Sequence, residues 1–526
     1  MEAVDRGSNL FPRSFKEELA LAVRAEGIYI FDENGNRYID GCSGALISSL
    51  GHGVREVTDA ISEQLGNLAF AHPSRWRNRA IEEAAAEVAE ITPGDLNYIW
   101  FVSGGSEAIE SAIKMARQYF IEKDGVGTSR YLVIGRWNSY HGSTLGSMAI
   151  GGNMPRRRYF SPMFKDHPKI QTHYCYRCPF GLEYPSCGVK CACELEDAIK
   201  KIGPQYVAAF IAEPIVGSTV GALVPPDEYW PMVREICDRY GVLLIADEVM
   251  TGFGRTGKAF GVDHWNVVPD IMAAAKAMAA GYIPTGGVFA SEKVVDVFRK
   301  GSGVFVHGHT YNGNPLSGAA TAATLRYMKK NGLFENASQQ GEILGKAMGS
   351  LAAIPIVGDV RGKGLMRGIE IVSDKVSKSP FPRGKKASAV VTSECMRRGL
   401  VIYPSGGMVD GVDGDNFMIA PPLNVTSGQV EEIVGSCILR GIGLCCHLHH
   451  HRFRRCRRDL LPPWRCHGRS TEQGWDRRQG HITFDSGFEG ELSPAGRWQD
   501  PARYVHGVHA LPGLHGDRSL RGGREA

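Results

Sequence analysis

The chain has 526 residues, of which 43% are hydrophobic and 22% charged, an ordinary balance for a globular protein large enough for more than one domain. No apolar run reaches the roughly 18 residues of a membrane-spanning helix, and the N-terminus lacks a signal-peptide core, so we expect a cytoplasmic protein with no membrane partner. Residues 437–526 hold fifteen Arg, no Lys and nine Asp or Glu, a net charge of +6, which leaves −2 for residues 1–436. The body therefore lacks the basic field that nucleic-acid binding requires.

The N-terminal part predicts a β-hairpin followed by two helices. Two alternating runs within Gly27–Asp40 flank Asn34-Gly35, a dipeptide that favours a tight hairpin turn. Helical periodicity then covers Val54–Leu68 and Asn78–Glu90.

From Tyr98 onward, strands alternate with helices, which is typical of a mostly parallel sheet. A strand at Tyr98–Val102 leads through a glycine-rich turn to a helix at Glu107–Phe120. After a helix at Pro315–Lys330, the segment Gly332–Thr426 has the pattern of a smaller α+β unit. Further strands, the last of them a candidate for antiparallel pairing, are predicted at Tyr131–Gly135, Tyr206–Ala212, Val242–Ala246, Ile271–Ala275 and Gly286–Ala290.

Three of these apolar strands are followed by a charged residue, namely Glu213, Asp247 and Lys276. Ligands of open α/β sheets bind outside the carboxyl ends of the strands, so these three residues are candidates for one site. Buried charges are costly unless paired, which favours a functional role over a structural one. A lysine can form a Schiff base with a carbonyl, and a buried carboxylate can keep a heterocyclic nitrogen protonated. Pyridoxal phosphate needs both groups.

Two further stretches could hold the phosphate and the ring of such a cofactor. Ser103–Ser106 lies between a strand and a helix, where backbone N–H groups and the helix dipole favour an anion. A plain tight turn explains this stretch equally well. Tyr140 follows the strand Tyr131–Gly135 and could stack on a planar ring, although a packed surface tyrosine is the simpler explanation when it is considered alone.

Taken in order, these segments resemble a class III aminotransferase, a pyridoxal-phosphate enzyme of fold type I. The resemblance covers about residues 15–436 and implies a large, mostly parallel seven-stranded sheet with helices on both faces, plus a smaller α+β domain. It assigns residues 1–70 and 326–436 to the small domain and residues 71–325 to the large cofactor-binding domain. The motifs that carry it are Ser103–Ala108, Tyr140–Gly142, Glu213-Pro214, Ala246–Gly257, Lys276, His309–Pro315 and Val360–Leu365.

The resemblance also implies roles for individual residues at the ring of the cofactor. Lys276 resembles the catalytic Schiff-base lysine, which later moves a proton. Asp247 resembles the catalytic partner of the pyridinium nitrogen. Val249 would pack on one face of the ring and Tyr140 on the other. The remaining cofactor-binding candidates near the ring are His141 and Glu213.

At the phosphate, the resemblance implies a site shared between two chains. Gly105 and Ser106 would hold the phosphate from one subunit. Thr310 resembles the threonine that reaches the phosphate of the neighbouring subunit, so a homodimer is implied.

Two departures from the family pattern bear on the substrate. Ser143 stands where relatives that act on ornithine, acetylornithine or 4-aminobutyrate carry an arginine, and the sequence around it resembles the ω-amine:pyruvate branch. Met418 stands where many relatives carry another arginine. We expect transfer of an amino group from a primary amine or ω-amino acid to a keto acid such as pyruvate. An aminomutase, a decarboxylating aminotransferase and an inactive truncated relative stay open as alternatives.

Five cysteines cluster between residues 175 and 193. A Cys-x2-Cys pair with further cysteines nearby can bind zinc, but transamination chemistry needs no metal. We therefore assign no metal ligand and favour a reduced, loop-packing cluster, with structural zinc as the alternative. The five residues are Cys175, Cys178, Cys187, Cys191 and Cys193.

Residues 437–526 differ from the rest of the chain in composition. This tail is rich in arginine without lysine and holds nine of the seventeen histidines. We interpret it as an aberrant, disordered extension read from a shifted frame, with a genuine basic arm as the alternative.

Overall fold

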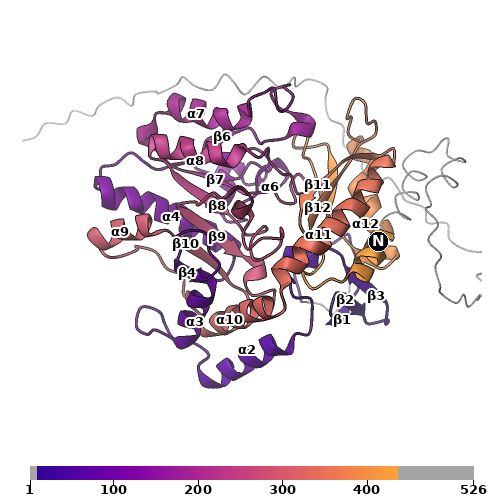
Figure 1. Cartoon of the computed structure of the whole chain (residues 1–526), viewed down its shortest axis with the longest axis horizontal. Coiled ribbons are helices and arrows are strands. Elements are labelled where there is room, and N and C mark those ends of the chain that lie inside the picture. Colours follow the sequence, from indigo (N-terminus) through magenta and orange to yellow (C-terminus); the bar gives the residue numbers. More distant parts are fainter. Residues whose placement is uncertain (1–8, 436–526) are drawn as a thin grey trace, which may run out of the picture. The chain divides into compact units, whose positions relative to one another are not determined.

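A seven-stranded sheet forms the centre of the computed structural model, which describes residues 9–435 (Figure 1). The tail predicted at 437–526 lies outside the described residues. Listed from one edge of the sheet to the other, the strands are β4 (Tyr98–Val102), β10 (Gly286–Ala290), β9 (Ile271–Ala275), β8 (Leu243–Asp247), β7 (Val207–Ala212), β5 (Leu132–Arg136) and β6 (Lys169–Ile170).

The pairing of these strands confirms the mostly parallel sheet. Strands β6, β5, β7, β8 and β9 pair in parallel. Strand β10 pairs antiparallel with both β9 and β4, as predicted for Gly286–Ala290. Strand β6 has two residues, too few to show an alternating pattern in the sequence, and was not predicted.

Helices cover both faces of this sheet because successive side chains of a buried strand point to opposite sides. In β8, Leu243 and Ile245 belong to a core cluster with helices α4 and α9, whereas Leu244 packs in a second cluster with α7 and α8. The core cluster around Met272 adds α2, α3 and α10. The bounds are α2 (Arg55–Asn67), α3 (Arg79–Ala89), α4 (Gly105–Asp124), α7 (Lys190–Ile202), α8 (Tyr229–Tyr240), α9 (Glu292–Lys300) and α10 (Pro315–Lys330).

Two smaller sheets complete the fold. The predicted hairpin is confirmed as β2 (Tyr29–Asp32) and β3 (Arg37–Asp40), with β1 (Ala22–Glu26) on its free side. Strand β13 (Leu400–Val401) pairs in parallel with β3, so the two ends of the described chain share one sheet. The third sheet is antiparallel and packs with α11 (Leu333–Gly349) and α12 (Ala387–Arg397). Its strands are β11 (Val357–Lys363), β12 (Met366–Ile371), β15 (Asp415–Ile419) and β14 (Tyr403–Gly406).

This third sheet and its helices form the smaller α+β part of the fold, on the right in Figure 1. The domain boundaries at residues 70, 325 and 436 stay predictions. Residues 427–435 are helical up to the last described residue, and Val430 and Ile433 in this helix are buried. The remaining short elements are α1 (Ser43–Leu46), α5 (Leu145–Ile150), α6 (Met154–Arg157), η1 (Ser161–Met163), η2 (Cys175–Arg177), η3 (Pro204–Tyr206), η4 (Gly261–Trp265), η5 (Lys276–Met278), η6 (Ser350–Ala353) and η7 (Arg383–Lys385).

Helices α3 and α4 begin at or close to the positions predicted from the sequence. The Asn78 side chain accepts a hydrogen bond from Ile81 N at 3.0 Å and caps α3, where the sequence predicted the helix to begin. Helix α4 begins at Gly105, two residues before the predicted start, so the glycine-rich turn and the first turn of the helix are continuous.

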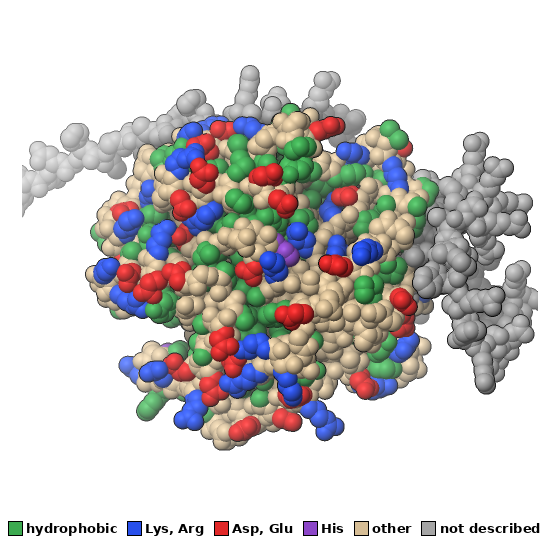
Figure 2. Space-filling model, viewed as in Figure 1, with side chains coloured by type: hydrophobic (Ala, Val, Ile, Leu, Met, Phe, Trp, Pro, Cys, Tyr) green, Lys and Arg blue, Asp and Glu red, His purple; other side chains and the backbone are tan. Residues whose placement is uncertain are grey.

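Acidic and basic side chains are interspersed over the face shown in Figure 2. That distribution agrees with the nearly neutral charge of the body. Within residues 9–435, none of the helices combines the length and the apolar character that crossing a membrane requires.

Candidate active site

A cavity of about 360 Å³ opens at the carboxyl ends of β7, β8 and β9. Its position agrees with the rule that ligands of α/β sheets bind outside these strand ends. Eight of the nine residues predicted for the site line it: Gly105, Ser106, Tyr140, His141, Glu213, Asp247, Val249 and Lys276. The ninth, Thr310, is exposed and does not line this cavity.

Lys276 directly follows β9 and has a backbone φ of 47°, in the left-handed region that non-glycine residues rarely adopt. Such a conformation costs about 1–3 kcal/mol and is concentrated at functional sites. Burial lowers the pKa of Lys276 from its usual 10.5 to about 8, although the negative charge of Asp247 opposes this shift. Roughly a tenth of the amine is therefore uncharged at pH 7, and an uncharged amine can attack a carbonyl carbon.

Asp247 ends β8 and is only 3% exposed. Its Oδ2 lies 2.7 Å from His141 Nδ1, and its Oδ1 accepts a hydrogen bond from Val249 N at 3.0 Å. Because a carboxylate can only accept, Nδ1 of His141 carries the hydrogen in this contact. Two donors thus fix the carboxylate at the edge of the cavity. Among the described residues, His141 Nε2 is buried without a hydrogen-bond partner.

The neighbouring acid Glu248 points away from the cavity. Its carboxylate accepts hydrogen bonds from Gly261 N at 2.8 Å, from Val262 N at 2.9 Å and from the Thr251 hydroxyl. Burial raises the pKa of Glu248 to about 7. Glu248 therefore anchors the following loop, while Asp247 is the acid that faces the cavity.

Glu213 holds the loop that carries Tyr140. Its Oε1 accepts a hydrogen bond from Tyr140 N at 3.0 Å, and its Oε2 lies 3.3 Å from Arg136 Nη2. Arg136 is fully buried and also faces His173 Nδ1 at 3.0 Å. Burial and the charge of Arg136 hold the pKa of His173 well below its usual value, so His173 is neutral and accepts from Arg136. Arg136 and His173 were not predicted, although Arg136 also ends an apolar strand.

The first turn of α4 opens into the cavity through Gly105 and Ser106. A β-carbon at Gly105 would lie 3.0 Å from Val249 Cγ1, so a larger residue would crowd the wall of the cavity. The Ser106 hydroxyl accepts a hydrogen bond from Ser143 N at 3.0 Å. The N–H groups at the start of a helix bind anions well, and this end of the cavity suits a phosphate group.

The donor set of the cavity fits a phosphorylated planar aldehyde. The lining offers a helix N-terminus, a carboxylate and a partly neutral amine. Tyr140 and Val249 line the cavity as well and provide an aromatic and an aliphatic surface for a ring. Their packing on opposite faces of one ring stays a prediction.

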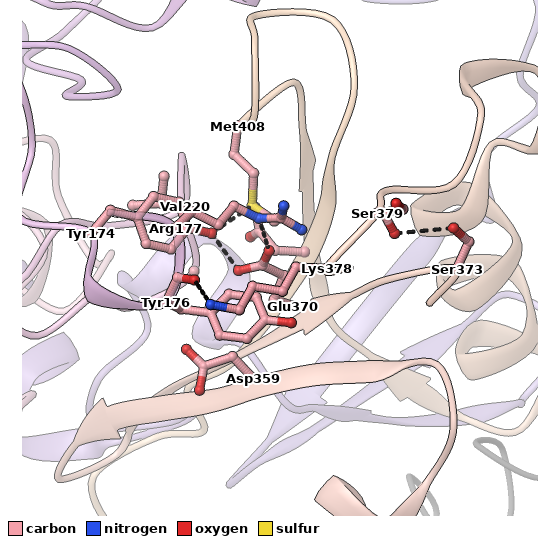
Figure 3. A network of polar contacts seen from close by, with 12 residues as sticks. Tyr174, Tyr176, Arg177, Val220, Asp359, Glu370, Ser373, Lys378, Ser379 and Met408 are labelled. Atoms are coloured by element: carbon pink, nitrogen blue, oxygen red, sulfur yellow. Dashed lines mark hydrogen bonds and ion pairs between the residues drawn. The ribbon is translucent and has the colours of Figure 1, made fainter. Parts of the chain in front are cut away.

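A buried acid on β12, Glu370, joins the cysteine-rich segment to the small α+β part (Figure 3). Its carboxylate accepts hydrogen bonds from Arg177 Nε at 2.5 Å, from Arg361 Nη1 at 2.9 Å and from the Tyr174 hydroxyl. This cluster could not be predicted from the sequence because its members lie up to 196 residues apart.

Arg361 connects this cluster to the cavity wall. Its guanidinium donates to Gly221 O at 3.0 Å and to the carbonyl of Val220. The same loop contributes Gly217 and Ser218 to the lining of the cavity. The arginine of the predicted Val360–Leu365 motif therefore positions a wall of the site.

Four of the five clustered cysteines line one small cavity of about 20 Å³: Cys175, Cys178, Cys187 and Cys191. Burial raises the pKa of Cys191 to about 12, which keeps its thiol protonated. In the part of the chain that the structure describes, no group of three or more His, Cys, Asp or Glu residues is arranged to hold a metal. The choice between a reduced cluster and a zinc site stays a prediction.

Residues 11–438 match the family profile described as Aminotransferase class-III. The chain belongs to the class III aminotransferases. It is 41% identical over 411 residues to the uncharacterized aminotransferase YodT of Bacillus subtilis, covering 78% of this chain and 92% of that protein. It is 34% identical over 446 residues to a putrescine–pyruvate aminotransferase of Pseudomonas aeruginosa, covering 82% of this chain and 94% of that protein.

A solved structure agrees with this assignment of the class III aminotransferase fold. The chain resembles the pyridoxal-phosphate-bound amine transaminase of an uncultivated Pseudomonas species with a TM-score of 0.76 and 32% identity. The match covers 84% of this chain and 98% of that chain. Class III aminotransferases are pyridoxal-phosphate enzymes that catalyse transamination, which confirms the predicted fold, enzyme class and cofactor.

Proposed function

We propose that this class III aminotransferase moves an amino group from a primary amine or ω-amino acid to a keto acid such as pyruvate. The observation that carries the proposal is that none of the described residues lining the cavity is an arginine. Ser143 leaves no arginine after the Tyr140–Gly142 motif, and Met418 is fully buried in the core, where it cannot contact a substrate. The relative from Pseudomonas aeruginosa named for putrescine and pyruvate supports this substrate class.

The remaining walls of the cavity suit an amine with an apolar body. Ile47, Met250, Ile283 and Pro284 line it, and all four have side chains without charge. A charged carboxylate on the donor would meet no arginine among the cavity-lining residues. An apolar surface of this kind favours donors with an apolar body next to the reacting amine.

In the proposed mechanism, Lys276 would hold the cofactor through its side-chain amine, and the same amine would move a proton at the substrate carbon that bears the amino group. Asp247 keeps the ring nitrogen protonated, and His141 fixes the orientation of that carboxylate through the 2.7 Å contact. Glu213 orients Tyr140 through its backbone N–H. When bound, pyridoxal phosphate supplies the electron sink that lets the substrate carbon lose a proton.

We also propose that the enzyme is a cytoplasmic homodimer. Phe70, Trp76 and Val306 are large apolar side chains with exposed fractions of 40%, 69% and 78%. Tyr311, next to Thr310, contacts Phe70 with ring centroids 5.8 Å apart. This surface would suit a second copy that places Thr310 at the partner's site. Light scattering that gives the mass of one chain would contradict the dimer, and cell fractionation would test the location.

A donor panel with pyruvate tests the substrate proposal. We expect putrescine and other primary amines or ω-amino acids to give higher kcat/KM values than ornithine or acetylornithine. Alanine formed from pyruvate, measured by chromatography, is the readout. The inference from Ser143 fails if acetylornithine or ornithine is the best donor. Product formation without any acceptor would instead indicate an aminomutase, and release of carbon dioxide would indicate a decarboxylating enzyme.

The lowered pKa of Lys276 predicts a pH profile for cofactor capture. Only the uncharged amine reacts, so the second-order rate should rise about tenfold per pH unit below pH 8 and level off above it. The rate is followed by absorbance after apoenzyme is mixed with pyridoxal phosphate at pH values from 6 to 10. Dividing by the rate of a free lysine derivative, first corrected for the ionisation of its own amine, removes the ionisations of the cofactor. A rate that still rises about tenfold per pH unit from pH 8 to pH 10 would mean that Lys276 has an ordinary pKa.

A further inference from the structure

A keto-acid acceptor brings a carboxylate into the site, and a buried carboxylate needs a positive partner. Among the described residues that line the cavity, Lys276 is the only lysine or arginine, and it is committed to the cofactor. Ser143 and Met418 occupy the positions where many relatives carry the arginine. A cation supplied by the same chain would therefore have to come from a side chain next to the cavity.

Three arginines near the cavity are already engaged. Arg136 is fully buried between Glu213 and His173. Arg255 is fully buried and donates to Pro421 O at 2.5 Å and to the Ser49 hydroxyl at 3.1 Å. Arg361 pairs with Glu370 at 2.9 Å. Moving any of them would leave buried polar groups without partners, which costs about 1–3 kcal/mol per group.

Arg156 is different. It lies on α6, and its guanidinium carbon is 4.2 Å from the centre of the Tyr140 ring. Its side chain is partly exposed, and the described residues provide it with no carboxylate. By contrast, its neighbour Arg157 pairs with Asp166 at 2.6 Å. The contact of Arg156 is therefore with the aromatic residue of the active site.

Two further observations place the positive charge of Arg156 close to the reacting groups. Its positive charge contributes to the lowered pKa of Lys276. It also lines a small second cavity together with Tyr140, His141 and Gly142, all of which line the main cavity as well. The backbone of α6 is fixed at this point, because the Asn153 side chain accepts from Arg156 N at 3.2 Å.

We propose that Arg156 binds the carboxylate of the keto-acid acceptor in this site, a role that rests on the proposed function. A planar guanidinium can donate two parallel hydrogen bonds to a carboxylate. When an amine without a carboxylate occupies the site, the same guanidinium stacks on Tyr140, so its charge keeps a favourable contact. One cation beside the Tyr140 ring thus serves the carboxylate of the acceptor and leaves room for an uncharged donor.

The test compares acceptors that differ in the carboxylate. Arg156→Met and Arg156→Gln are assayed with pyruvate and with an aliphatic aldehyde, at a fixed amine donor. We expect kcat/KM for pyruvate to fall about 10- to 100-fold, mainly through KM, while that for the aldehyde changes less than about threefold. Arg156→Lys should retain part of the activity with pyruvate. Arg158→Met, an exposed arginine on the same segment, is the matched control and should behave as wild type.

A second readout does not depend on turnover. Aminooxyacetate and O-methylhydroxylamine both capture the cofactor aldehyde, and only the first carries a carboxylate. The wild-type holoenzyme should react faster with aminooxyacetate, and Arg156→Met and Arg156→Gln should lose that preference in the absorbance traces. The proposal is overturned if both variants keep the preference, or if both acceptors lose activity equally. A wild type that aminates neither acceptor would refute the proposed function, while the two capture rates would still decide the role of Arg156.

Discussion

Replacing Lys276 by alanine is expected to abolish turnover, a loss of about four or more powers of ten, or more than about 5 kcal/mol of transition-state stabilisation. The variant loses both the group that holds the cofactor carbonyl and the base that moves the substrate proton. The absorbance of the lysine-bound cofactor should disappear with the activity. Alanine also relieves the strained left-handed backbone only in part, because the φ of 47° disfavours every residue with a β-carbon.

Lys276→Arg is the matched control for this substitution. It keeps a positive charge and a long side chain, but arginine stays protonated and cannot attack a carbonyl. We therefore expect it to be as inactive as Lys276→Ala while folding normally by circular dichroism. Normal turnover in either variant would rule out the assigned role of Lys276.

Asp247→Asn should lower kcat by about two or more powers of ten, about 3 kcal/mol, with little change in shape. The amide cannot hold a ring nitrogen protonated, and it also disturbs the contact with His141 at 2.7 Å. Steady-state kinetics with one amine and pyruvate measure the effect.

Glu248→Gln provides the comparison for Asp247→Asn, because the two acids are adjacent and both are buried. Glu248 faces backbone N–H groups rather than the cavity, so its substitution should lower the melting temperature while kcat stays within about threefold. A loss below tenfold in Asp247→Asn, or an equal loss in both variants, would make Asp247 a structural residue.

The central sheet and the three charged residues at its strand ends could be predicted from the sequence because short local patterns indicate them. Short apolar strands that end in a charge mark the carboxyl edge of a parallel sheet, and Glu213, Asp247 and Lys276 do line one cavity. Strand ends were less predictable. The predicted strand Val242–Ala246 extends to Asp247, because the backbone of that residue still pairs with Ala273.

The supporting contacts could not be predicted because they join residues that are remote in the chain. His141 meets Asp247 across 106 positions, and Arg136 meets Glu213 across 77. No pattern in either segment reveals the other. One signal was available and unused, since Arg136 ends an apolar strand as the three predicted residues do. A charge at such a position indicates that a partner lies at the same sheet edge.

The position of the covalent link to the cofactor tests the central claim most directly. The holoenzyme is reduced with borohydride, digested, and analysed by mass spectrometry, with untreated enzyme as the control. We expect a single modified lysine, and we expect it in the peptide that contains Lys276. A phosphopyridoxyl group on any other lysine, with Lys276 unmodified, would contradict the account of this site.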